Sequence, residues 1–166
     1  MEKRSGDGFV RCADGHVRWG RFGAAGVLFV WRPAGKPVHV MLQQRSAFAH
    51  EGGTWSTAGG AIDEGETPFE AAMREAAEEV GDAPPGYRLL GQYVFAPAED
   101  WSYTTIVVEV DRHFGASINF ETDAVVWVPL ELVDHRPLHA GFAAAWPHLR
   151  AIVEGVAHPV SDDRSQ

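Results

Sequence analysis

The sequence has few of the features that would place a protein outside the cell or in a membrane. The only cysteine, Cys12, cannot form an internal disulfide, which is typical of proteins of a reducing cytoplasm. The longest aliphatic run, Ala24 to Trp31, is far shorter than the roughly 20 residues that span a bilayer. Residues 1–8 are polar and charged, unlike a secretory signal peptide. We therefore expect a cytoplasmic protein without a membrane partner.

Positive charge is also scarce. The chain has 14 Lys and Arg residues against 23 Asp and Glu residues, so its formal net charge is -9. A surface of this sign is unfavourable for a nucleic acid polymer or an anionic membrane, and it suits a protein that recruits divalent cations. We expect a small molecule as the partner rather than a nucleic acid.

What the sequence does contain is enough apolar material for one core. Of the 166 residues, 45% are hydrophobic, and no repeat or long linker divides the chain. We expect a single domain over residues 1–166, with its core at about 20–155 and a polar tail at 161–166.

Alternating or apolar segments predict a mixed sheet covered by helices, an α/β or α+β sandwich. Asp14 and Gly15 are expected to form a two-residue hairpin loop between residues 9–12 and 16–19. Residues 50–60 are expected to be irregular, and a helix at 138–155 is expected to break or kink at Pro147. The remaining strands are expected at residues 24–31, 38–44, 87–96, 102–110 and 124–128.

A central helix is predicted from about Pro68 to Val80. Thr67 can cap its first turn together with Glu70, and Gly81 is a natural end. The helical period gathers apolar residues on one face and places three carboxylates on the opposite side, within one turn. They are Glu75, Glu78 and Glu79.

These carboxylates have two interpretations. They form either a solvated acidic face or a set of oxygen ligands for a hard cation such as Mg²⁺ or Mn²⁺. The segment before the helix favours the second interpretation, because Gly59 and Gly60 allow a close backbone approach and residues 63–66 form an acidic loop.

The whole segment from Gly60 to Asp82 resembles the Nudix box, G-x5-E-x7-R-E-U-x-E-E-x-G-U, in which U is bulky and aliphatic. All fixed positions match, from Gly60 and Glu66 to Gly81. The two U positions differ, since they hold Ala76 and Asp82. The resemblance implies an α/β/α sandwich with a central mixed sheet. It also implies hydrolysis of a nucleoside diphosphate linked to another group, with bound Mg²⁺ or Mn²⁺ as cofactor.

The resemblance also implies roles for individual residues. Glu78 and Glu79 match the main metal ligands, and the Gly60 carbonyl is expected to be a further ligand. Glu75 is expected to be a ligand or the general base, and Arg74 is expected to orient a neighbouring glutamate. Some family members take the base from a loop outside the box.

Three further residues outside the box are candidates for the site. Glu121 lies in a polar segment before the strand at 124–128, and it is the alternative general base. Gln43 and Arg45, at the end of the strand at 38–44, are candidate substrate-binding residues, with Arg45 suited to a phosphate.

Alternative functions differ in their sequence requirements. A non-catalytic Nudix ligand-sensing module is disfavoured because all box carboxylates are retained. An enzyme similar to isopentenyl diphosphate isomerase is disfavoured because Cys12 is far from the box. Among hydrolases, nucleoside triphosphates, nucleotide sugars and dinucleotides remain open as substrates, and so does the oligomeric state, although a homodimer would be common in the family.

Overall fold

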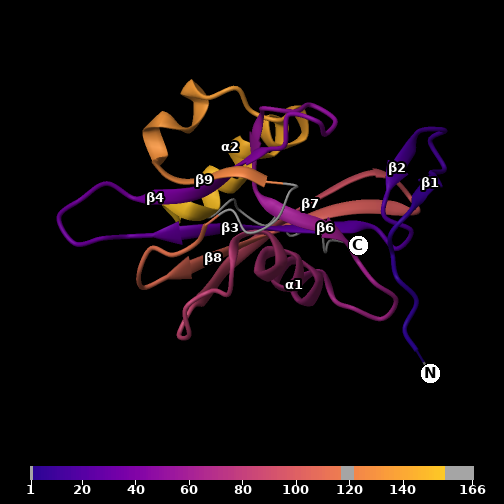
Figure 1. Cartoon of the computed structure of the whole chain (residues 1–166), viewed down its shortest axis with the longest axis horizontal. Helices are drawn as coiled ribbons and strands as arrows, with labels where there is room; N and C mark the ends of the chain where they lie inside the picture. Colours follow the sequence, from indigo (N-terminus) through magenta and orange to yellow (C-terminus); the bar gives the residue numbers. More distant parts are fainter. Residues whose placement is uncertain (1, 117–121, 156–166) are drawn as a thin grey trace, which may run out of the picture.

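The computed structural model describes residues 2–116 and 122–155. In this part of the chain a short hairpin precedes a seven-stranded mixed sheet with helices on both faces (Figure 1). The strands are β1 (Phe9–Arg11), β2 (Val17–Trp19), β3 (Ala24–Trp31), β4 (His39–Arg45), β5 (Trp55–Ser56), β6 (Ala58–Ala61), β7 (Arg88–Ala98), β8 (Trp101–Val110) and β9 (Thr122–Pro129). The helices are α1 (Pro68–Val80), the 3-10 helix η1 (Leu130–His135) and α2 (Ala140–Glu154).

Strand β3 organises the sheet. One of its edges pairs with β8 in parallel, from Ala24 opposite Tyr103 to Trp31 opposite Val110. The other edge is divided between two antiparallel partners, because β6 pairs with its first half and β4 with its end. Strand β9 continues the sheet beyond β4, and β7 forms the edge beyond β8. A continuous apolar sequence suits β3, since both of its faces are covered.

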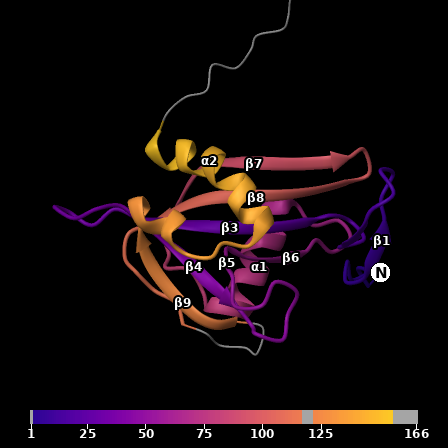
Figure 2. The ribbon, with the colours of Figure 1, turned by 90° about the horizontal axis from the view of Figure 1, so that it is seen from above.

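The two long helices lie on opposite faces of the sheet (Figure 1). Helix α1 packs on the face that carries Val27 and Phe29 of β3. Helix α2 packs on the other face, against Leu28 and Val30 and over β7 and β8 (Figure 2). This is the α/β/α sandwich expected from the sequence.

Helix α1 begins as its sequence predicts. The Thr67 hydroxyl accepts the Glu70 backbone N–H at 3.1 Å, and the Glu70 carboxylate accepts the Thr67 N–H at 3.3 Å. Gly81 ends the helix with a φ of 101°, a positive value that favours glycine. The residues around the box are therefore held at the ends of a well-capped helix.

Two expectations for local structure were wrong. The first hairpin turns through three residues rather than two, because the Cys12 N–H donates to the His16 carbonyl at 2.8 Å and the Gly15 N–H donates to the Cys12 carbonyl. Gly15 has a φ of 87°, as in a type I turn followed by a left-handed residue. Residues 50–60 are not wholly irregular. Strand β5 in this segment pairs with β4, and β6 pairs with β3.

A third expectation was a break or a kink at Pro147, and the break does not occur. Helix α2 runs from Ala140 to Glu154 without interruption. The proline removes a hydrogen bond to the carbonyl of Ala143, and Ala143 lies on the exposed side of the helix. Burial of Trp146 and Leu149 on the other side of the helix keeps it in place.

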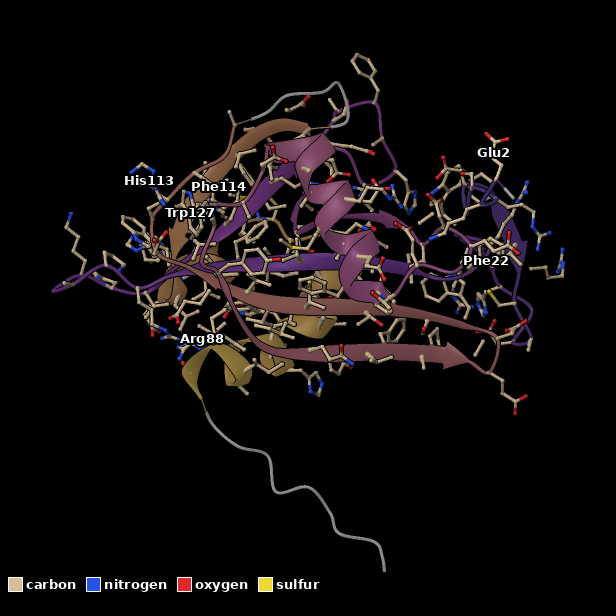
Figure 3. The ribbon with its side chains drawn as sticks, turned by 90° about the horizontal axis from the view of Figure 1, so that it is seen from below. Glu2, Phe22, Arg88, His113, Phe114 and Trp127 are labelled. Carbon is tan, nitrogen blue, oxygen red and sulfur yellow. The ribbon has the colours of Figure 1, made fainter. Side chains whose placement is uncertain are left out.

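A partly buried aromatic group closes the α1 side of the core at one end of the sheet. Phe114 and Trp127 lie 6.1 Å apart between ring centroids, and the indole N–H of Trp127 donates to the Phe114 carbonyl at 2.9 Å. Figure 3 shows this pair at the end of the molecule opposite Phe22. Within the described residues, no helix has the length and apolar character needed to cross a membrane.

Candidate active site

Arg74 ties the loop before α1 to the helix itself. Its guanidinium donates to both oxygens of Glu66 at 2.9 Å, to Glu75 Oε1 at 2.8 Å and to the Ala61 carbonyl at 3.0 Å. Glu66 also accepts the backbone N–H of Asp63 at 2.7 Å, which closes the loop. The paired guanidinium lowers the pKa of Glu66. Arg74 therefore fixes the position of Glu75, and Glu66 fixes Arg74.

Glu79 is buried, with only 4% of its surface exposed. One of its oxygens accepts the Gly59 backbone N–H at 3.2 Å and the Gln43 side-chain amide at 3.1 Å. The amide oxygen of Gln43 in turn accepts the Thr122 hydroxyl at 3.1 Å. Residues of β4 and β9 thus hold this carboxylate against the Gly59 backbone in β6.

Glu75 lies directly against Gly60. A methyl group built on Gly60 would be 2.6 Å from a carboxylate oxygen of Glu75, so a larger residue there would displace this carboxylate. Burial raises the pKa of Glu75, although Arg74 acts in the opposite direction. The negative charges of Glu78 and Asp7 raise this pKa further. Glu75 is therefore a desolvated carboxylate near other anionic groups.

The three helix carboxylates do not share one solvated face, contrary to the expectation from the helical period. Glu79 and Glu75 point toward the sheet, and only Glu78, whose side chain is 59% exposed, points toward solvent. No three acidic, imidazole or thiol side chains of the described residues gather closely enough to enclose an ion. The box therefore presents one buried, one partly buried and one exposed carboxylate around the Gly59-Gly60 backbone.

Tyr103 of β8 is a residue of this site that the sequence analysis missed. Its hydroxyl fills the space left by two glycines, because methyl groups on Gly26 and Gly59 would be 2.4 and 2.6 Å from it. Burial raises the pKa of Tyr103 to about 12, and the Thr57 hydroxyl is its hydrogen-bond partner. An isolated glycine inside a strand often marks a close approach, so Gly26 was the available signal.

A cavity of about 940 Å³ connects these groups to solvent. Glu75, Glu78, Glu79 and Gly60 line one part of it, and Arg45 is at its rim, where Arg45 Nε donates to the His50 carbonyl at 3.0 Å. Aromatic residues of the sheet line another part, and they are Tyr93, Phe95 and Trp101, while Tyr103 lies beside the glycines. A cavity of this size, acidic in one part and aromatic in another, can hold a molecule as large as a nucleotide.

The residues selected from the sequence have different places in this cavity. Gln43 and Arg45 both line it, although the Gln43 amide is occupied by Glu79 and Thr122. Glu121 lies outside the described residues, so its role stays a prediction.

Comparison with known proteins agrees with this geometry. The sequence model of the NUDIX domain matches residues 20–149. A Mycobacterium tuberculosis protein named "Putative 8-oxo-dGTP diphosphatase 3" is 39% identical over 167 aligned positions, which cover 97% of this chain and 76% of that protein.

Solved structures show the same fold. The crystal structure of a Nudix hydrolase from M. smegmatis, RenU, matches with a TM-score of 0.82 and 34% identity over 92% of this chain and 98% of that one. A C. elegans Ap4A hydrolase matches with a TM-score of 0.64 and 21% identity over 80% of this chain and 98% of that one, which supports the fold alone.

Proposed function

This chain belongs to the Nudix hydrolase family and is a pyrophosphohydrolase, and we propose that its substrate is a nucleoside triphosphate, cleaved to a nucleoside monophosphate and pyrophosphate. The triphosphate class is favoured because the M. tuberculosis relative is named for 8-oxo-dGTP. Among the three substrate classes that the sequence leaves open, this is the one that a relative above 30% identity supports.

One observation carries the proposal: a buried carboxylate, Glu79, and a partly buried one, Glu75, line a nucleotide-sized cavity beside the Gly59-Gly60 backbone. A desolvated carboxylate such as Glu75, close to other anionic groups, is costly for a fold. Only Arg74 approaches Glu75 as a cation in the described structure, and Glu66 shares it. This cost is offset if the site binds a cation together with its substrate.

The chemistry of the donors here fits a hard divalent cation, although in the described structure the three carboxylates are not gathered closely enough to enclose one. Nudix hydrolases generally depend on such a metal, and carboxylate and carbonyl oxygens are the ligands that Mg²⁺ and Mn²⁺ prefer. We assign the holding of Mg²⁺ or Mn²⁺ to Glu75, Glu78, Glu79 and the Gly60 carbonyl. When bound, the cation supplies an acidified water and neutralises phosphate charge. A like-charged site could not otherwise hold a pyrophosphate.

The roles of the remaining groups follow from their contacts. Glu75 accepts the proton of the attacking water, and Arg74 keeps its carboxylate oriented through the bond at 2.8 Å. Gln43 holds Glu79 rather than the substrate, because its amide donates to that carboxylate. Arg45 at the cavity rim binds a phosphate oxygen of the substrate. Glu121 is the alternative base if the loss of Glu75 leaves catalysis intact.

The reaction is tested in ¹⁸O-labelled water with Mg²⁺ and dGTP or 8-oxo-dGTP. The expected products are the nucleoside monophosphate and pyrophosphate, with label in one product after a single turnover, because a water and no enzyme nucleophile attacks. Cleavage of phosphate monoesters at a comparable rate, or a trapped phosphoryl-enzyme, would contradict the proposal. Binding of nucleotides without any turnover would instead favour a sensing module.

A further inference from the structure

The segment before residue 20 lies outside the range matched by the NUDIX sequence model, yet it forms part of the cavity wall. Asp7, Arg18 and Trp19 all line the cavity that contains the box carboxylates. Figure 1 shows the β1–β2 hairpin at the same end of the molecule as the turn between β7 and β8. The hairpin is therefore an addition to the matched domain that reaches its site.

Hydrogen bonds at two places fix this addition to the body of the protein. The Gly6 N–H donates to Asp63 at 2.8 Å, and the Glu64 N–H donates to the Arg4 carbonyl at 3.0 Å, which joins the segment to the box loop. At the other end, the Ala13 N–H donates to Asp100 at 2.8 Å in the turn between β7 and β8. The hairpin thus bridges the acidic loop and the aromatic strands.

Arg18 is the hairpin side chain that faces the aromatic strands. Its guanidinium carbon lies 5.3 Å from the centre of the Trp101 ring. Two of its nitrogens donate to the two oxygens of Asp14, at 2.8 and 2.7 Å. The Arg18 side chain is 19% exposed. Its pairing with Asp14 fixes the plane of the guanidinium and neutralises its charge.

Trp101 contacts Arg18 through its ring and not through its N–H. Among the described residues, its indole nitrogen is buried and has no hydrogen-bond partner. A phenylalanine would avoid the cost of that unpaired donor, but the indole offers the larger face and the stronger attraction for a guanidinium. The guanidinium of Arg18 therefore lies over the Trp101 ring in the cavity wall.

The chemistry of this pair selects among the parts of a nucleotide. A phosphate would meet an arginine whose charge is satisfied, and it would be repelled by the Asp14 carboxylate. A neutral planar ring meets a delocalised, weakly hydrated surface on which bases stack. Tyr93 and Phe95, on the same face of the sheet, extend this aromatic part of the cavity.

We propose that Arg18, held on Trp101 by Asp14, is the surface on which the nucleobase of the substrate stacks, so that the β1–β2 hairpin determines which nucleotides the enzyme accepts. This inference rests on the proposed function, because it assumes that the phosphates lie at the carboxylates.

Two probes that need no turnover separate base binding from phosphate binding. The first is a guanosine triphosphate with a methylene group between its α and β phosphates, and the second is methylenediphosphonate, which has no base. Both are titrated by calorimetry in Mg²⁺. Arg18→Met should weaken binding of the guanine probe about tenfold, the order expected for a lost stacking surface, and should leave methylenediphosphonate binding unchanged.

One variant separates the plane of the guanidinium from its charge, and a second serves as the control. Arg18→Lys keeps the charge and should lose nearly as much guanine affinity as Arg18→Met. Arg11→Met is the matched control, because Arg11 is an exposed arginine of the same hairpin that does not line the cavity. It should leave the binding of both probes unchanged.

The possible results decide the inference without ambiguity. If Arg18→Met weakens the binding of both probes equally and Arg18→Lys restores it, Arg18 binds the phosphates and the inference is overturned. If Arg18→Met weakens the binding of neither probe, the inference is also overturned. If Arg18→Met unfolds, Trp101→Phe should still weaken the guanine probe alone by a few-fold. Failure to turn over dGTP would overturn the proposed function, while the probe comparison would still test the stacking surface.

Discussion

The two helices that cover the sheet bury very different residues. Helix α1 buries Ala71, Ala72, Ala76 and Val80 together with a glutamate, Glu79. Helix α2 buries four large apolar residues, Phe142, Trp146, Leu149 and Val153. Small side chains let α1 approach the sheet closely enough for its carboxylates to reach the β6 backbone. The comparison teaches that α2 is fixed to the sheet mainly by large apolar side chains, whereas α1 is shaped to bring carboxylates to the β6 backbone.

The largest expected effect concerns the buried carboxylate of α1. Glu79→Gln should lower kcat/KM by about 10³-fold in Mg²⁺, because a ligand charge is lost from the site. The melting temperature measured in EDTA should be unchanged or higher, since the variant no longer buries an anion. The increase in melting temperature that Mg²⁺ causes in the parent protein should be much smaller. An unchanged Mg²⁺ response would show that Glu79 is not a ligand.

The opposite pattern is expected on α2. Leu149→Ala should lower the free energy of unfolding by about 3 kcal/mol, because it leaves a cavity in a fully buried position. Urea denaturation measures this loss, and kcat at a temperature where the variant is folded should stay within twofold of the parent. A large loss of kcat in the folded variant would mean that the two faces are coupled.

A smaller effect is expected from a carboxylate that holds the site without lining the cavity. Since the folded-state pKa of Glu66 is lowered, its ionised form contributes stability that is present above its ordinary pKa of 4.5 and is lost as the pH falls. Glu66→Gln should cost about 1.5 kcal/mol at pH 7. Below pH 4.5 the difference from the parent should shrink, as measured by urea denaturation at a series of pH values. A difference that is constant with pH would contradict the role of the Arg74 pair.

The smallest effect is expected at the start of α1. Thr67→Ala removes the side-chain cap and should cost about 1 kcal/mol of stability. Thr67→Ser keeps the hydroxyl and should cost much less, so it serves as the control in the same denaturation assay. Both variants should retain kcat, because the cap lies at the far end of the helix from Glu78 and Glu79. A loss of kcat in Thr67→Ala alone would show that fraying of α1 reaches the site.

Much of α1 could be predicted because its signals are local. Thr67, Glu70 and Gly81 lie within or beside the helix they define, and the box residues share its turns. The burial of Glu79 could not be predicted, because its partners Gln43 and Gly59 come from other strands. The helical period alone treats a glutamate as a polar residue that faces solvent.

Other parts of the site depend on contacts between distant segments. Strand β6 contains two glycines and a weak strand sequence, and it forms because β3 offers a free edge. The position of Arg18 follows from a turn that contacts Asp100, almost ninety positions later in the chain. Such contacts have no periodicity in the sequence, so only the structure brings Arg18 and Tyr103 into one cavity.

The parallel pairing of β3 with β8 has a consequence for how the protein is made. It joins residues about eighty positions apart. It also covers one edge of β3, the strand whose other edge pairs with Gly59 and Gly60 of β6. Closing so long a segment of chain costs entropy before any contact compensates for it, so we expect this pairing to form late. During synthesis, the helix with the carboxylates leaves the ribosome well before β8. A nascent chain that ends before β8 therefore has the complete box but no nucleotide site.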